Sequence, residues 1–188
     1  MRRRLLTIGI GASVLSAATA TVLTITTHRT MPRPVLSCAG VSVRVPSGWH
    51  GRIRGGNGGG FTLTFATFSL VSETDAIDEQ SAERMAADDI LVLLIGYGRG
   101  QADNPAFRTR VRLPLTVQKM KVYSRFEHLQ PGHRLARAIF VAQGAAYDVQ
   151  VQFGSPLNPF LRREADSALR LLRFSHPSHQ KLNRRTRC

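Results

Sequence analysis

Few of the residues that could act in catalysis or bind a metal have the sequence spacing that is typical of catalytic or metal sites. The 188-residue chain contains no G-x-S-x-G nucleophile, no H-E-x-x-H zinc motif and no C-x-x-C pair. Among its six histidines, His176 and His179 have close ligand spacing, but no carboxylate stands near them. A constellation such as Ser124, His128 and Asp148 could be assembled only in three dimensions. We therefore expect no enzyme, metal or cofactor; the alternative is a small hydrolase whose site is not visible in the sequence.

Two glycine-rich segments, 51–60 and 96–100, resemble phosphate-binding loops only superficially. A phosphate loop follows a strand and precedes a helix N-terminus. Segment 51–60 instead precedes a strand pattern, and segment 96–100 lacks both the G-x-G-x-x-G spacing and a helix pattern after it. We interpret 51–60 as a flexible hairpin connection, so no nucleotide cofactor is expected.

Arg108, Arg110 and Arg112 are the candidate anion-binding residues. They alternate with apolar residues in a segment, 107–117, that has the pattern of a strand, which would place the three arginines on one face about 7 Å apart. Such a row could follow an anionic polymer. It could equally keep an edge strand from aggregating, and both interpretations stay open.

The chain as a whole is strongly basic. It has 26 Lys and Arg against 12 Asp and Glu, a net charge of +14, and 23 of its cations are arginine. Either a GC-rich genome or selection for bidentate anion contacts would enrich arginine over lysine. A basic surface favours an acidic partner, such as nucleic acid, a lipid surface or an anionic envelope polymer.

The N-terminal sequence indicates export. Three arginines, at positions 2–4, precede 22 uncharged residues from Leu5 to Thr26, enough for a helix of about 33 Å. Residues 1–26 are therefore a signal peptide, with Ala18-Thr19-Ala20 as a cleavage pattern, or an uncleaved membrane anchor. Both alternatives leave the rest of the chain outside the cytoplasm, secreted or anchored. This location favours an anionic membrane surface or envelope component, or a protein, over nucleic acid.

Cys38 and Cys188 are the two cysteines of the chain. An oxidising compartment permits a disulfide between them, which would join the two ends of the domain. Cys188 could also be a free thiol in a polar tail. Lipidation of Cys38 is disfavoured, because charged residues and prolines separate it from the apolar N-terminal run.

The remaining patterns predict one α+β domain over 38–174, after a linker at 27–37 and before a basic flexible tail at 175–188. The strand patterns are mostly alternating, whereas 90–97 is continuously apolar and should be a central strand. They fall at 41–45, 61–70, 90–97, 107–117, 122–126, 135–142 and 147–153. A short helix should follow Thr74 or Asp75, and Asn158-Pro159 should open a second helix with an apolar stripe to Leu172. We expect an antiparallel sheet flanked by helices.

This order of elements resembles the PsbP-like α/β sandwich, in particular small secreted or lipid-anchored actinobacterial proteins of the LpqN type. The resemblance covers about residues 40–174 and rests on Val45-Pro46-Ser47-Gly48-Trp49, the strand end at Phe153-Gly154 and the closing helix. It implies a non-catalytic docking or assembly role, and it supplies no active-site motif. The sequence thus predicts a non-enzymatic, exported binding or envelope-assembly module with a basic surface.

Overall fold

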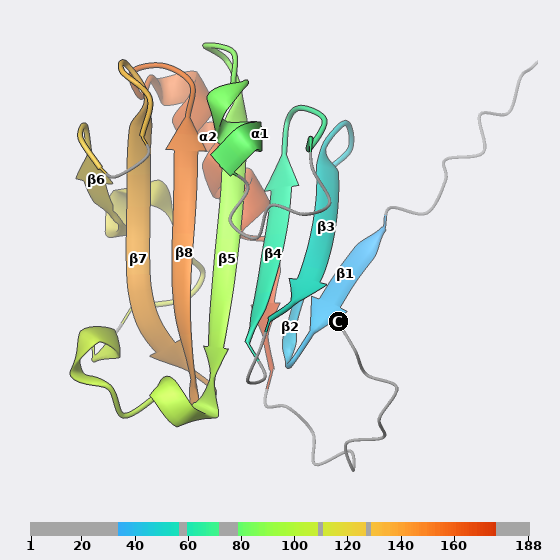
Figure 1. Cartoon of the computed structure of the whole chain (residues 1–188), viewed down its shortest axis with the longest axis vertical. Coiled ribbons are helices and arrows are strands. Elements are labelled where there is room, and N and C mark those ends of the chain that lie inside the picture. Colours follow the sequence, from blue (N-terminus) through green and yellow to red (C-terminus); the bar gives the residue numbers. More distant parts are fainter. Residues whose placement is uncertain (1–33, 57–59, 72–78, 109–110, 127–128, 176–188) are drawn as a thin grey trace, which may run out of the picture. The chain divides into compact units, whose positions relative to one another are not determined.

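The computed structural model describes residues 34–56, 60–71, 79–108, 111–126 and 129–175. These residues form two antiparallel sheets with few helices, an α+β-like, mostly sheet architecture (Figure 1). A six-stranded sheet has the order β3-β4-β5-β8-β7-β6, and a three-stranded sheet has the order β1-β2-β9. The strands of the larger sheet are β3 (His50–Gly55), β4 (Phe61–Ala66), β5 (Ile90–Gly98), β6 (Lys121–Tyr123), β7 (Arg134–Ala142) and β8 (Ala145–Phe153). Those of the smaller sheet are β1 (Val35–Cys38), β2 (Val41–Arg44) and β9 (Leu172–Phe174).

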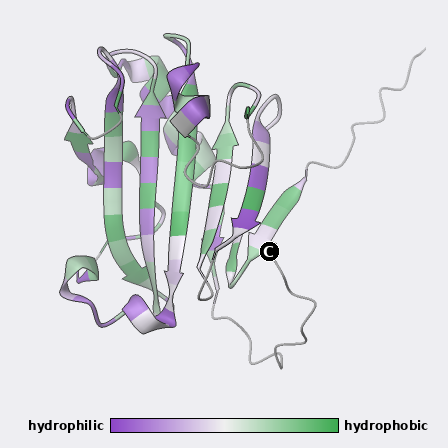
Figure 2. Ribbon diagram, in the orientation of Figure 1, coloured by the Kyte–Doolittle hydropathy of each residue, from purple (hydrophilic) through white to green (hydrophobic). Residues whose placement is uncertain are grey.

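The centre of the large sheet is the part that the sequence pattern predicts best. β5 lies between β4 and β8, and its residues from Ile90 to Leu94 are buried on both faces, as its continuous apolar run indicates. β8 alternates between hydrophobic and hydrophilic residues (Figure 2). The β7–β8 hairpin closes at Gln143 and Gly144, both with positive φ, which matches the twist of antiparallel strands.

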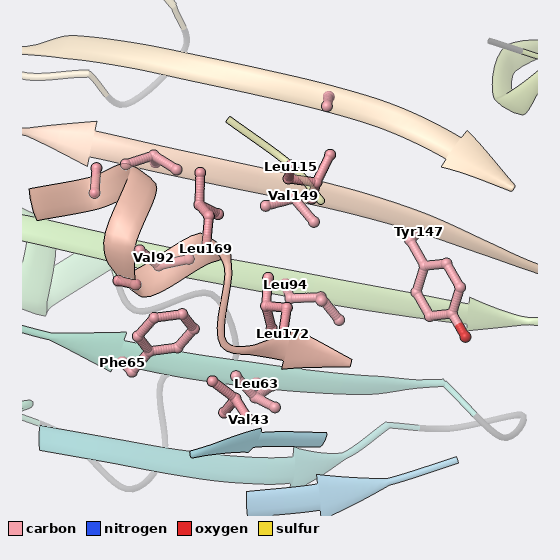
Figure 3. Close-up of a cluster of buried hydrophobic side chains, with 14 of the residues drawn as sticks. Val43, Leu63, Phe65, Val92, Leu94, Leu115, Tyr147, Val149, Leu169 and Leu172 are labelled. Atoms are coloured by element: carbon pink, nitrogen blue, oxygen red, sulfur yellow. The ribbon is translucent and has the colours of Figure 1, made fainter. Parts of the chain in front are cut away.

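One face of the large sheet is covered by α2 (Pro159–Leu169) and by the three-stranded sheet. Asn158 caps α2, because its Oδ1 accepts a hydrogen bond of 2.9 Å from the Leu161 amide. Inward-pointing side chains from both sheets and α2 form one core, shown in part in Figure 3. At its β9 end, the Phe174 ring lies 5.0 Å from that of Tyr147 and 5.6 Å from that of Phe140.

The other face of the large sheet carries α1 (Glu79–Glu83), which lies in front of the sheet in Figure 1, while α2 lies behind it. Ala82 and Met85 pack there against Ala66 and Leu91 in a second, smaller cluster. The predicted caps of this helix, Thr74 and Asp75, lie outside the described residues. The two helices therefore occupy opposite faces of the large sheet.

The predicted strand over 107–117 is wrong. Its described residues form no strand, and a 3-10 turn lies at each end of the segment: η3 (Pro105–Phe107) and η4 (Val117–Lys119). Asn104 caps η3 by accepting from the Ala106 amide, and Pro114 has no N–H to give to a sheet ladder. Local turn chemistry therefore prevails over apolar alternation in this segment.

Smaller differences concern the edges of the domain. β1 begins at Val35, within the predicted linker, and β9 is a strand that the sequence patterns did not indicate. β4 ends at Ala66 and is therefore four residues shorter than the strand pattern at 61–70. Trp49 is half-buried and packs on the core, with its ring 5.7 Å from that of Phe65. In the described part of the chain, no helix is long and apolar enough to cross a membrane; residues 1–26 lie outside it.

Candidate anion-binding surface

The three arginines predicted as an anion site do not form a row on a strand. Arg108 and Arg112 are exposed on the irregular connection between β5 and β6, and Arg110 lies outside the described residues. The backbone carbonyl of Arg112 accepts a hydrogen bond of 3.1 Å from Lys119 Nζ, which also donates to the Pro114 carbonyl. Without strand geometry, the regular 7 Å spacing on which the prediction rested is absent.

Asp148, the carboxylate of the hypothetical catalytic constellation, is occupied by other contacts. Its side chain is 1% exposed, and Arg137 donates to it through Nε at 3.0 Å and Nη2 at 2.6 Å. Gln150 Nε2 adds a contact of 3.1 Å. The hydrogen bond with Asp148 raises the pKa of Arg137 further above its ordinary value. Ser124 is exposed, and His128 lies outside the described residues. The Arg137–Asp148 pair therefore links β7 to β8.

A shallow groove of about 400 Å³ lies where the β3–β4 hairpin meets β5. Its lining residues are Gly56, Gly60, Phe61, Thr62, Ile95, Gly96, Tyr97 and Gln101. Tyr97 is the ionisable side chain among them, and its pKa is raised, mainly by burial and further by the Asp148 charge. Among the described residues, no three His, Cys, Asp or Glu side chains gather as a metal site would require. The described residues that line the groove thus include no converging acid and base groups such as a hydrolytic site uses.

Exposed arginines instead gather on the layer formed by α2, β2 and β9. We call this surface the arginine face; its members are Arg44, Arg162, Arg163, Arg170 and Arg173, all exposed. None of them forms an ion pair with another described residue. They extend over one helix and two strands that are distant in the sequence. Sequence analysis did not find this surface.

The local structure explains why these side chains point away from the core. On α2, the residues Leu161, Ala165, Ala168 and Leu169 are buried, so Arg163 and Arg170 occupy the opposite stripe of the helix. On β2 and β9, alternation sends Val41, Val43 and Leu172 inward, and Ser42, Arg44 and Arg173 outward. Because α2 and the small sheet cover the same face of the large sheet, their outward sides face the same solvent region.

Carboxylates on this layer do little to offset the charge. Glu164 is half-buried at the flank of α2. Asp166 Oδ1 accepts a hydrogen bond of 2.6 Å from the Val117 amide, which ties η4 to α2. Arg173 Nη1 donates to the Arg170 carbonyl at the end of α2, and this contact holds Arg173 close to the helix. The arginine face therefore has an excess of positive charge.

The opposite side of the large sheet has a different charge pattern. Three carboxylates, Glu83, Asp88 and Asp89, lie on the described part of α1 and on the turn that leads to β5, beside Arg84. The cations of the β3 strand there, Arg52 and Arg54, are half-buried and each is engaged in an interaction. Lys121 on β6 is exposed, over the ring of its neighbour Tyr123. The carboxylates of α1 and of the turn after it therefore lie on the side of the large sheet opposite the arginine face.

Cys38 is buried in β1 and is disulfide-bonded. Cys188 lies outside the described residues, so the pairing of these two cysteines stays a prediction. Both ends of the described domain, Pro34 and Ser175, flank the three-stranded sheet, since β1 begins at Val35 and β9 ends at Phe174. The basic segments that the sequence places before and after the domain are therefore attached at the layer of the arginine face.

Comparison with known proteins identifies no relative: no protein-family model, curated protein or solved structure matches the chain.

Proposed function

We propose that the chain is an exported, non-enzymatic binding module that docks an anionic component of the cell envelope, and that its domain is a PsbP-like α/β sandwich. The observation that carries this proposal is the arginine face, where five exposed arginines share one layer while α1 and its carboxylates lie on the opposite side of the sheet. Such segregation attracts an anionic partner and orients it toward one side of the domain.

The location outside the cytoplasm is part of the proposal. It rests on the sequence, in which the arginines at 2–4 precede the uncharged residues 5–26. In that compartment the available polyanions are envelope polymers, anionic lipids and acidic proteins. The occupied Asp148 and the groove without converging ionisable groups favour this function over a hydrolase.

Polyanion binding by the full chain tests the proposal. Inorganic polyphosphate is titrated into the chain in a non-ionic detergent, and heat release gives the affinity at two salt concentrations. The variant Arg163→Gln/Arg170→Gln/Arg173→Gln should bind about 100-fold more weakly, since each cation near a dense anionic surface contributes about 1 kcal/mol. Binding by the unaltered chain should weaken steeply between about 50 and 200 mM salt.

The matched control removes the same charge from other elements. Arg84, Arg99 and Arg125 are also exposed; they lie directly after α1, on η2 (Arg99–Gln101) and after β6. Replacing these three by Gln should cost a few-fold in affinity, through the lower net charge alone. If the two triple variants bind polyphosphate equally, the arginine face is not the docking surface, and the proposal fails.

A further inference from the structure

We infer that the anionic component is a phospholipid bilayer, and that Phe160 inserts into it while the arginine face contacts the lipid headgroups. This inference rests on the proposed function and names its ligand. Phe160 is 62% exposed, more than any other large hydrophobic side chain in the described part of the chain. A single exposed apolar residue is common on protein surfaces, so what distinguishes Phe160 is its position beside the arginines of α2.

The position of Phe160 on α2 joins it to the arginines. Phe160, Arg163, Ser167 and Arg170 follow one another at intervals of three, four and three residues, which places them on a single stripe of the helix. That stripe is opposite the buried residues. An aromatic ring flanked by arginines on the outer side of a helix is typical of segments that lie in a membrane interface, where the ring enters the headgroup boundary and the cations contact phosphates.

A second exposed apolar residue lies on the same layer. Val35 of β1 is 57% exposed and is the cross-strand partner of Arg44 on β2. Directly opposed residues of an antiparallel pair share a face, and the next pair, Leu36 and Val43, points to the core. Val35 and Arg44 therefore repeat, on the small sheet, the combination of an apolar side chain and a cation that α2 presents.

The predicted membrane anchor would be joined to this layer by a short segment. Eight residues, 27–34, lie between Val35 and Thr26, the end of the uncharged segment, and an extended chain of that length spans at most about 30 Å. If residues 1–26 remain as an anchor, the domain is tethered by the layer that carries the arginine face. The tether would raise the effective concentration of lipid at this face, so a single inserted ring and a few arginines suffice for docking.

A bilayer explains these observations better than the other partners do. A soluble polyanion or a wall polymer would use the arginines but would gain nothing from Phe160. An acidic protein could cover both, but it would be expected to offer a pocket for the ring, and nothing in the structure indicates such a partner. A bilayer would use the arginine face, Phe160 and Val35 together.

Insertion of residue 160 can be measured directly in the full chain, incorporated in nanodiscs so that residues 1–26 have their natural surroundings. The variant Phe160→Trp places a fluorophore on the arginine face, and the unaltered chain, with its half-buried Trp49, provides the baseline. Nanodiscs contain either phosphatidylcholine alone or equal parts of phosphatidylcholine and phosphatidylglycerol, with acyl chains brominated to quench tryptophan. Quenching beyond the baseline is expected in the anionic discs and should be at least twofold smaller in the neutral ones.

Charge removal then separates docking from tethering. In the Phe160→Trp background, Arg163→Gln/Arg170→Gln/Arg173→Gln should abolish the extra quenching, whereas Arg84→Gln/Arg99→Gln/Arg125→Gln should retain it. The inference is overturned if the probe is not quenched in anionic discs, if neutral discs quench it equally, or if both triple variants behave alike. If the probe is not quenched in anionic discs but polyphosphate binding still depends on the arginine face, the proposed function stands, and its ligand is a soluble polymer or a protein.

Discussion

Removing Arg137 should be among the most damaging single changes to the sheet, although it deletes a partly exposed side chain. The Asp148 side chain is 1% exposed and that of Arg137 is 24% exposed. In Arg137→Met, the carboxylate loses both nitrogens of the guanidinium and keeps only the contact of 3.1 Å from Gln150. An uncompensated buried charge costs about 3–5 kcal/mol, whereas an exposed ion pair is worth about 0–1 kcal/mol.

The reverse change should cost less, and the double change least. In Asp148→Leu, the guanidinium of Arg137 keeps access to water and to the ring of Phe126, 5.3 Å away, so we expect a loss of about 1–2 kcal/mol. In the double variant no buried charge remains, and an apolar pair on adjacent strands should bring the loss to about 0–1.5 kcal/mol. The order of the three variants is the prediction.

Urea unfolding followed by circular dichroism measures these differences, provided that the slope of free energy against urea is unchanged. The coupling between the two sites should be about 3 kcal/mol or more and favourable. If Arg137→Met and Asp148→Leu each cost less than about 1 kcal/mol, water reaches Asp148 and the pair behaves as a surface salt bridge. If instead the double variant is as unstable as Arg137→Met, apolar side chains do not fit the site and the argument from charge burial is wrong.

Three other predictions concern packing, pH and location. A Cβ added at Gly96 would clash with Cε1 of Phe61, so Gly96→Ala should lower the urea midpoint markedly. Adding Phe61→Leu to Gly96→Ala should recover part of the loss, and equal midpoints for all variants would contradict this packing. Burial lowers the pKa of His133 below 6.5, so the contribution of the neutral imidazole to stability is present above about pH 6.5 and is lost as the pH falls. In thermal melts between about pH 7.5 and 5, the melting temperature of His133→Gln should depend less on pH than that of the unaltered chain. An unchanged pH dependence would refute the assignment. Alkaline phosphatase fused after Phe174 should be active, whereas an inactive fusion beside an active cytoplasmic reporter would contradict export.

The parts of the fold that sequence predicts well are those where local and long-range signals agree. The β7–β8 hairpin needs only alternation and a two-residue turn. The structure differs from the prediction only at the strand ends: β7 starts at Arg134, and β8 starts at Ala145, which pairs with Ala142. The second helix likewise begins where Asn158 and Pro159 indicate, although it ends at Leu169. In both cases the spacing of the apolar residues, the turn or capping residues and the final packing all specify the same element.

The failures lie where a local signal competes with the chain's surroundings. Alternation over 107–117 suggested a strand, but Asn104-Pro105 starts a 3-10 turn, and the chain wraps past the sheet instead of joining it. The arginine face was missed for a different reason. Arg163 and Arg170 could have been found as the outer stripe of the predicted helix, but their proximity to Arg44 and Arg173 depends on β9 pairing with β2, a contact between the two ends of the domain.

The distribution of the arginines bears on the question that composition left open. A genome rich in G and C would enrich arginine wherever an exposed cation is tolerated, and it gives no reason for the carboxylates of α1 and the exposed arginines of α2 to lie on opposite sides of one sheet. Selection for docking does give such a reason. Because surface substitutions of this kind usually change stability by less than about 0.5 kcal/mol, the two triple variants should remain folded and differ only in binding. Equal losses of binding would assign the charge to composition, whereas a loss specific to Arg163, Arg170 and Arg173 would assign it to function.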